Sequence, residues 1–158
     1  MSDVYNIAKA AALGVPTEVA ATLDLSNDVV RIALFDNEGG SPYSFNADHD
    51  YVSTVFDGGA TGEEFTGTGY NRQGTTGISV STDDTDDEGV FDADDVTFSS
   101  IDGATIAAAL SYKQVGGDDQ SPSDDPLLAH LTSTDFPLTA NGGDVTLNFA
   151  TEGIVNIT

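Results

Sequence analysis

Val145-Thr146-Leu147-Asn148-Phe149 shows the cleanest alternation of apolar and polar side chains in the chain. Because successive side chains of a β-strand point to opposite faces, this stretch predicts a strand with one buried face. The preceding Asn141-Gly142-Gly143-Asp144 predicts a turn, since Asn and Gly tolerate positive φ. A turn followed by an alternating strand is the pattern from which we interpret the rest of the chain.

Similar short segments recur along the sequence and predict eight or nine strands separated by Gly, Asp and Asn turns. They are residues 29–35, 51–56, 64–73, 77–81, 90–101, 105–115, 127–131, 145–149 and 154–157. No alternation of strands with helices indicates a parallel sheet. We therefore expect an all-β fold, an antiparallel β-sandwich, of which a jelly roll is one form, with a barrel as the alternative.

The alternation also predicts which side chains share a face. In residues 29–35, we expect Val30, Ile32 and Leu34 to point one way. In residues 90–101, the two apolar residues of Val96-Thr97-Phe98 should lie on one face. In residues 105–115, the residues expected on one side are Ile106, Ala108, Leu110 and Tyr112.

The N-terminal residues 2–13 predict the one helix of the chain. Ser2 is a candidate N-cap, the segment is rich in alanine, and Gly14 followed by Pro16 should end the helix. A second helical turn or a linker is expected over residues 17–21. The predicted organisation is an N-terminal helix or arm over residues 1–21 and a single β-sandwich domain over residues 22–158.

The charge is extreme, because 27 acidic side chains face only four basic ones, Lys9, Arg31, Arg72 and Lys113, and the formal net charge is −23. Self-repulsion of this size opposes a compact state in dilute buffer, whereas molar salt screens it. The composition therefore predicts a protein that folds in strong brine, from a halophilic host or its virus. The alternative of an acidic disordered chain is disfavoured by the 39% apolar content, with eight Phe and five Tyr in alternating runs.

Composition excludes several classes of function. The chain has no Cys, which excludes disulfides and thiolate metal sites. Four scattered cations cannot form the basic patch that nucleic-acid binding needs. No apolar run approaches the roughly 20 residues of a membrane span, and we expect no secretory signal.

One acidic segment partly matches the pattern of a calcium-binding loop. Asp84, Asp86, Glu88 and Asp95 occupy positions 1, 3, 5 and 12 of the pattern, with Gly89 at position 6. The pattern asks for Asp or Asn at position 5 and Glu at position 12, and no flanking helices are evident. The segment is interpreted as a solvated acidic loop, with a weak site for Ca²⁺, Mg²⁺, Na⁺ or K⁺ as the alternative; no other cofactor is expected.

The histidines and glycines give no assembled active site. Asp48-His49-Asp50 cannot converge in an extended segment, and His130 is expected to be a partly buried strand residue. A zinc site would need both histidines plus carboxylates, and no Gly-x-Ser-x-Gly elbow is present.

Gly67-Thr68-Gly69-Tyr70-Asn71-Arg72 predicts a kinked strand with close backbone approach. Asn156-Ile157-Thr158 matches a glycosylation acceptor. An enzyme is the least favoured class.

Several short blocks, in order, cover most of the chain after the N-terminal segment. They are Asp24-Leu25-Ser26-Asn27-Asp28-Val29-Val30-Arg31-Ile32-Ala33-Leu34, Gly67-Thr68-Gly69-Tyr70-Asn71-Arg72, Gly89-Val90-Phe91-Asp92-Ala93-Asp94-Asp95-Val96-Thr97-Phe98, Pro126-Leu127-Leu128-Ala129-His130, Phe136-Pro137-Leu138-Thr139 and Asn141-Gly142-Gly143-Asp144-Val145-Thr146-Leu147. Together they resemble a family of small virion proteins encoded by tailed phages and archaeal tailed viruses. The resemblance implies a structural virion component without known catalytic residues.

The leading hypothesis is therefore a non-enzymatic structural protein of a haloarchaeal tailed virus, a decoration or turret component on the capsid exterior. Its expected partners are the major capsid protein or other virion proteins and sister subunits in a homo-oligomer. We place these contacts in the less charged residues 2–21 and 136–140. The alternatives are a tail component (tube, terminator or baseplate-associated) and a cation-dependent module that binds the host surface.

Overall fold

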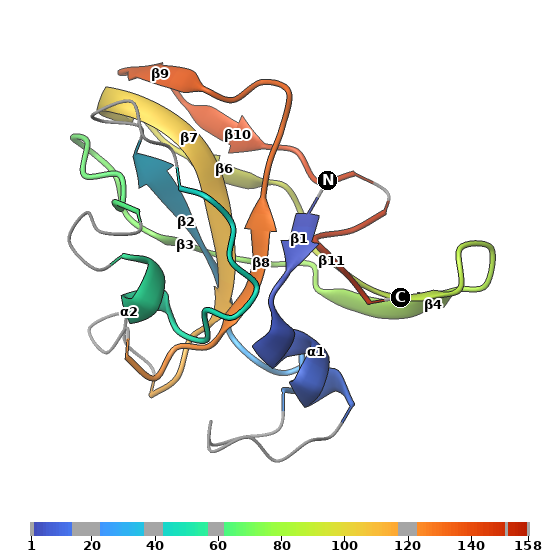
Figure 1. Cartoon of the computed structure of the whole chain (residues 1–158). Helices are drawn as coiled ribbons and strands as arrows, with labels where there is room; N and C mark the ends of the chain where they lie inside the picture. The colour runs from blue at the N-terminus through green and yellow to red at the C-terminus, as the bar shows by residue number, and fades with distance from the viewer. Residues whose placement is uncertain are drawn as a thin grey trace.

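The computed structural model describes residues 2–13, 23–36, 43–56, 62–116, 123–150 and 152–157. The described chain is mostly β, and all of its strand pairs are antiparallel (Figure 1). The elements are β1 (Ser2–Val4), α1 (Asn6–Ala12), β2 (Val30–Asp36), α2 (Val52–Val55), β3 (Gln73–Gly74), β4 (Ser79–Asp83), β5 (Glu88–Asp92), β6 (Val96–Phe98), β7 (Asp102–Lys113), β8 (Leu127–Leu131), β9 (Leu138–Asn141), β10 (Val145–Leu147) and β11 (Val155–Ile157).

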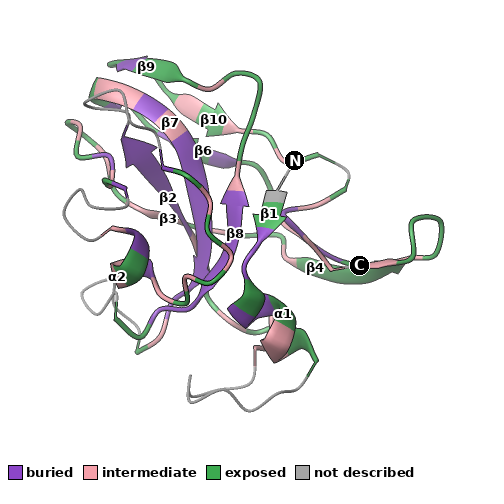
Figure 2. Ribbon diagram, in the orientation of Figure 1, coloured by how far each residue is buried: buried purple, intermediate pink, exposed green. Residues whose placement is uncertain are grey.

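The central sheet has the order β1-β8-β7-β2-β3. Strand β8 pairs with residues 109–112 of β7, and β9 pairs with residues 102–106 of the same strand. Two smaller sheets, β10-β6 and β11-β5-β4, complete the strand arrangement. Figure 2 shows that β2, β7 and β8 carry most of the buried positions, whereas β4 and its turn are exposed. This arrangement confirms the expected antiparallel, sandwich-like all-β fold.

The two faces of the central sheet pack against different layers. On one face, Phe35, Leu110 and Tyr112 pack with Tyr5 and with residues of the segment that contains α2. On the other face, Ile32, Leu34 and Ile106 pack with Val96 and Phe98 of β6. A third cluster joins Val4 and Leu128 to Phe91 and Val155 of the β11-β5-β4 sheet. The alternation expected along residues 29–35 therefore separates two buried faces rather than a buried face from solvent.

The predicted helix over residues 2–13 begins later than expected. Residues 2–4 form β1, which pairs with β8, and Ser2 is not the N-cap. The helix starts after Tyr5, which lies outside it and caps it with no side-chain hydrogen bond. Pairing with β8 and burial of Val4 and Tyr5 outweigh the local helix propensity. Gly14, Pro16 and the expected turn over residues 17–21 lie outside the described residues.

The predicted strand over residues 51–56 is wrong, because α2 is a single helical turn there. Its β-forming residues are overruled by local packing: the Val52 N–H donates to the Asp125 carbonyl, and Val52 and Val55 are buried. The segment 64–73 contains only isolated bridges before β3, and the segment 90–101 is divided between β5 and β6. Val96 and Phe98 are buried with Thr97 exposed, as expected.

Strand β7 carries a bulge that changes which residues share a face. Phe35 pairs with Ala108, but the next residue, Asp36, pairs with Ile106, so Ala107 is the extra residue. Ile106 consequently packs with the β6 side of the sheet, whereas Ala108 and Leu110 pack on the other side. The expectation that Ile106 shares a face with Ala108 is wrong, because strict period-two alternation does not continue through a bulge.

Candidate docking surfaces

A groove of about 960 Å³ opens where β8 and β9 separate. Both strands pair with the same edge of β7, with Leu131 opposite Ala109 and Leu138 opposite Ile106. The residues between them leave the sheet and form one wall, where the Phe136 N–H donates to the Ser133 carbonyl. The groove therefore forms at the gap between β8 and β9, which pair with successive parts of β7.

The opposite wall of the groove is the alternating stretch around β10. Val145, Leu147 and Phe149 are half-buried and line the groove. Thr146, which also borders the groove, is exposed, and its hydroxyl lies 2.9 Å from that of the exposed Thr97. At the N-terminal end, Asp3, Val4 and Lys9 also line the groove. The face of β10 that the sequence predicted as buried is thus only partly covered, although it packs against the core cluster around Ile32 and Phe98.

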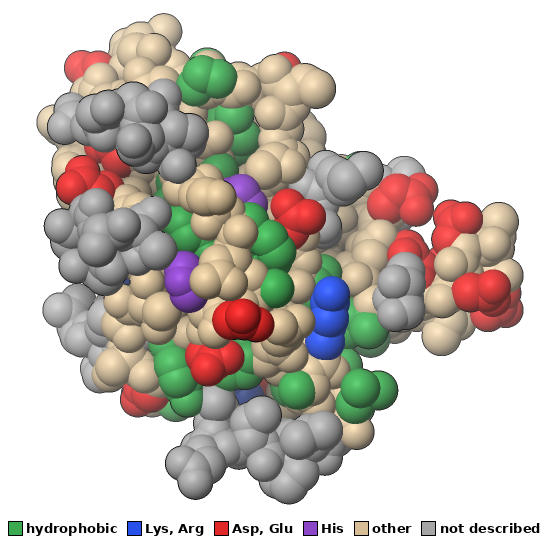
Figure 3. Space-filling view, in the orientation of Figure 1, with side chains coloured by type: hydrophobic (Ala, Val, Ile, Leu, Met, Phe, Trp, Pro, Cys, Tyr) green, Lys and Arg blue, Asp and Glu red, His purple; other side chains and the backbone are tan. Residues whose placement is uncertain are grey.

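A second surface is the hairpin formed by β4 and β5, which projects from the body of the molecule (Figure 1). Figure 3 shows acidic side chains gathered on this projection, at the right of the view. At the turn, a carboxylate oxygen of Asp83 accepts hydrogen bonds from the N–H groups of Thr85 (2.7 Å) and Asp86 (3.3 Å). These bonds lower the pKa of Asp83.

Of the four predicted cation ligands, only Asp86 belongs to a close group of carboxylates among the described residues. Among the described residues, the carboxylates of Asp83, Asp86 and Glu152 offer oxygens that all lie within 4.8 Å of one another. Asp95 instead accepts a hydrogen bond from the Phe149 N–H, and Glu88 accepts one from the side-chain amide of Asn156. The reason is that β5 runs extended after Glu88, whereas a calcium loop must curl around its ion. The fourth candidate, Asp84, lies exposed on the turn.

Sequence reasoning missed Asp83 and Glu152 as neighbours of Asp86. Glu152 lies far away in the sequence and reaches the turn only because β11 pairs with β5. Three carboxylates could supply oxygen ligands to a hard cation, but Asp86 and Glu152 are exposed to solvent. The cluster is equally suited to remain hydrated in salt.

His130 is confirmed as a strand residue and is more deeply buried than expected, at 5% exposure. Its ring stacks on Phe45 and meets Phe35 and Tyr43 edge-on. Burial lowers the pKa of His130, while the Asp3 carboxylate, 3.9 Å from the ring nitrogen Nδ1, opposes the shift. Among the residues that the structure describes, neither ring nitrogen has a hydrogen-bond partner. The histidine therefore lies within an aromatic cluster, where burial favours its neutral form.

In the Asp48-His49-Asp50 triplet, Asp48 and His49 bind different partners. The Asp48 carboxylate accepts a hydrogen bond from the side-chain amide of Asn6, and His49 Nδ1 lies 3.1 Å from the Tyr43 hydroxyl. Tyr43 also contacts the hydroxyl of Tyr5, whose pKa is raised by burial and by this hydrogen bond. Over the part of the chain that the structure describes, no close group of potential metal ligands includes either histidine.

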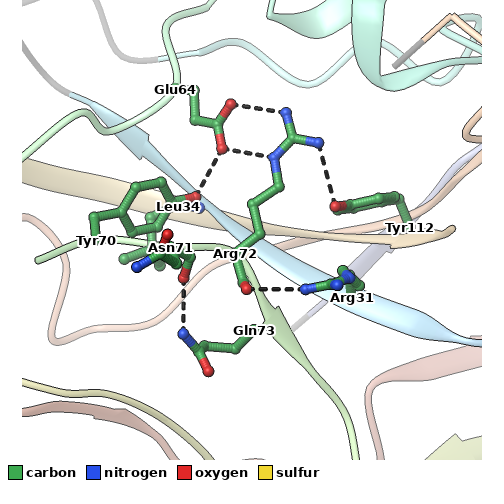
Figure 4. A network of polar contacts seen from close by, with 8 residues as sticks. All are labelled: Arg31, Leu34, Glu64, Tyr70, Asn71, Arg72, Gln73 and Tyr112. Carbon is green, nitrogen blue, oxygen red and sulfur yellow. Dashed lines mark hydrogen bonds and ion pairs between the residues drawn. The ribbon is translucent and has the colours of Figure 1, made fainter. Parts of the chain in front are cut away.

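Arg72 anchors the glycine-rich segment (Figure 4). Its guanidinium forms a bidentate pair with Glu64 at 2.7 and 2.8 Å and donates to the Tyr112 hydroxyl at 3.2 Å. Tyr70 donates to the same carboxylate and accepts from the Leu34 N–H. Burial lowers the pKa of Arg72, but the hydrogen bonds and charge of Glu64 outweigh it and raise the pKa overall. This closed network explains the conformation of the segment without any ligand.

The close backbone approach expected for the glycine motif is confirmed, whereas the expected kinked strand is wrong, because residues 67–72 form only an isolated bridge at Thr68. A Cβ on Gly67 would overlap the carbonyl oxygen of Asp102 and the ring of Phe65, and Gly69 has φ +81°. The backbone therefore approaches β7 as closely as only glycine allows. In the glycosylation-like triplet, the Asn156 amide lies in β11 and donates to Glu88.

No protein-family model matches the chain, and a search of curated proteins finds no match. Among the described residues, no helix is long and apolar enough to cross a membrane.

Proposed function

We propose that the protein is a non-enzymatic structural component of a haloarchaeal tailed-virus particle. Its place is the capsid exterior, as a decoration or turret component that docks on the capsid and on sister subunits. The proposal is supported by the ordered sequence blocks that resemble small virion proteins. The antiparallel β-architecture is compatible with that role, although fold by itself does not determine function.

The observation that carries the proposal is the composition of the groove. The two segments in which the sequence placed the contacts, residues 2–21 and 136–140, both contribute to it. Val4 and Lys9 come from the first segment, and Phe136 and Leu138 from the second. Segments far apart in the sequence therefore form one continuous surface that offers apolar side chains to a partner.

The groove also suits binding in strong salt. At 1 M salt the Debye length is about 3 Å, so charge attraction at the surface contributes little to affinity. Apolar burial contributes about 25 cal/mol per Å² and is not screened. Half-buried side chains such as Leu147 and Phe149, together with the 37% exposed Leu138, provide this kind of contact.

The direct test is to find the protein in purified virus particles. Particles isolated on a density gradient are analysed by mass spectrometry, and antibody-labelled particles are viewed by electron microscopy. We expect the protein in the particles and the label on the head. Label confined to the tail would replace the capsid assignment with a tail component, and absence from particles would refute the virion role.

A groove variant tests the docking surface. Leu138→Glu should reduce incorporation into particles while the purified variant keeps its unfolding temperature, because Leu138 is partly exposed in the isolated chain. Val29→Glu is the control, since Val29 is 54% exposed and is not among the residues that line the groove. Equal incorporation of both variants would exclude the groove. Deleting residues 2–13 is unsuitable, because β1 belongs to the central sheet.

A further inference from the structure

β4 is the outer strand of the three-stranded sheet β11-β5-β4. Within the described ranges, no strand pairs with its outer edge. Residues 79–82 of β4 are all exposed (Figure 2), although the side chains of a strand point alternately to the two faces of its sheet. Val80 is 57% exposed. Such an edge presents unpaired backbone groups that can accept another strand.

The β4 edge lacks the usual protection against pairing. Exposed edge strands commonly carry charged side chains or proline. Residues 74–82 contain neither, although the chain as a whole has 27 acidic residues in 158. The acidic residues resume at Asp83 and Asp84, where the strand ends. The edge is therefore uncharged along its length and acidic only at its tip.

A row of apolar side chains crosses this sheet and ends in solvent. Val155 of β11 lies opposite Phe91 of β5, and Phe91 lies opposite Val80 of β4. Val155 and Phe91 are each only 2% exposed, whereas Val80 is 57% exposed. Directly opposed side chains on neighbouring strands contact one another and stabilise the sheet. Over the described part of the chain, no strand continues this row beyond Val80.

We propose that β4 pairs antiparallel with β4 of a second copy of this chain, with the two Val80 residues opposite each other. The cross-strand row then continues through both sheets, from Val155 of one copy to Val155 of the other. A two-fold axis at Val80 makes the contact self-complementary, as closed dimers require. The uncharged edge of each copy meets the same uncharged edge.

The charge pattern favours this antiparallel arrangement. With Val80 at the axis, Asp83 of one copy lies opposite Gly77 of the other. The two Asp83 residues are then six residues apart along the pair, or about 20 Å at the rise of a β-strand. This separation exceeds the Debye length of about 10 Å at 0.1 M salt. A parallel pair in register would instead place the acidic tips side by side.

One like-charge approach remains and predicts salt dependence. Asp94 lies beside Gly77 and accepts a hydrogen bond from the Thr76 hydroxyl at 3.0 Å. Asp83 of the second copy would therefore approach Asp94. Molar salt screens this repulsion, so the dimer should be more stable in brine than in dilute buffer. The inference rests on the proposed function only for its expectation of self-assembly.

The first test is sedimentation of the purified chain in molar KCl over a wide concentration range. We expect a monomer–dimer equilibrium that Val80→Glu weakens roughly a hundredfold, because each copy loses a buried valine and the two new carboxylates face each other. Val29→Glu, at a valine of similar exposure, should leave the dimer unchanged. A monomer at all concentrations, or a dimer insensitive to Val80→Glu, overturns the proposal.

A second test reports the register directly. Because the chain has no Cys, Val80→Cys introduces a single thiol, which can form only an intermolecular disulfide. Mild oxidation in molar KCl should convert Val80→Cys to a covalent dimer much faster than Val29→Cys. Equal rates for the two variants contradict the proposed pairing. Both tests use the purified chain, so their failure leaves the particle labelling, which tests the proposed function, unaffected.

Discussion

At the scale of single residues, Arg72 is the centre of the polar network that anchors the glycine-rich segment. Its side chain is 12% exposed and that of Glu64 is 23% exposed. Replacing Arg72 with Met leaves a partly buried carboxylate without its bidentate partner. Because the site retains some solvent, we expect a loss of about 2 kcal/mol, below the range for fully buried pairs. Thermal unfolding in molar KCl should shift down by roughly 4–8 °C.

A double-mutant cycle separates the contribution of the Arg72–Glu64 ion pair to stability from that of side-chain packing. Glu64→Gln alone should also destabilise the fold, because Arg72 then keeps its charge without a carboxylate. The double variant Glu64→Gln with Arg72→Met should cost less than the sum of the two single changes. Strictly additive losses would show that the ion pair contributes nothing beyond the packing of its side chains.

His130 makes the stability depend on pH in a defined direction. Burial lowers the pKa of His130 from its ordinary 6.5, so the unfolded chain binds a proton more readily than the folded one. The fold therefore loses stability as pH falls below about 6.5, until the lowered folded pKa is reached. His130→Phe keeps an aromatic ring beside Phe45 and should reduce the decline in unfolding temperature between about pH 7.5 and pH 5.5.

The control for this titration is His49→Gln, which removes the other histidine. His49 contacts Tyr43, one of the rings around His130, and is therefore one residue removed from the buried histidine. If His130→Phe follows the same pH dependence as the unmodified chain, burial of His130 does not govern acid sensitivity.

At the scale of elements, sequence alternation identified strands best where the two faces differ in environment. The alternation of exposure predicted for residues 145–149 is confirmed, although β10 ends at Leu147, because Thr146 and Asn148 meet solvent while Leu147 meets the core side. β1 and α2 were not foreseen, because their conformations depend on pairing with β8 and on contacts of Val52 with a distant loop. The groove could not be predicted either, since its walls are separated in sequence and meet only in the folded sheet.

The glycine-rich segment gives a matched pair of substitutions. Gly67→Ala should destabilise the fold by about 2 kcal/mol, because its Cβ would overlap the Asp102 carbonyl oxygen and the Phe65 ring. Gly74→Ala, in β3, has no atom within 4 Å of its new Cβ and should change stability by less than about 0.5 kcal/mol. Chemical unfolding of both variants measures the difference. Similar stabilities would mean that the close approach at Gly67 is not required.

At the scale of the whole molecule, three of the four cations have internal roles, whereas Lys9 is exposed at the groove. Arg31 donates to Gln114 and to the Arg72 carbonyl oxygen, Arg72 pairs with Glu64, and Lys113 pairs with Asp28 at 2.9 Å. These contacts cannot neutralise the remaining acids, many of which lie exposed on turns such as the β4–β5 tip (Figure 3). The net charge of −23 therefore acts as a diffuse repulsion within the folded chain.

Salt should therefore stabilise the protein by screening rather than by filling a site. The unfolding temperature should rise from dilute buffer to about 1 M KCl, as the Debye length falls to about 3 Å. Changing Asp84 and Asp87 together to Asn should reduce this salt dependence, because exposed like charges are removed from one turn while Asp86 of the carboxylate cluster is kept. Asn tolerates the positive φ of Asp87, so the turn itself should persist. Changing Asp84 to Glu preserves the charge, leaves the positive φ of Asp87 undisturbed and serves as the control. An unfolding temperature independent of salt would rule out the halophilic interpretation.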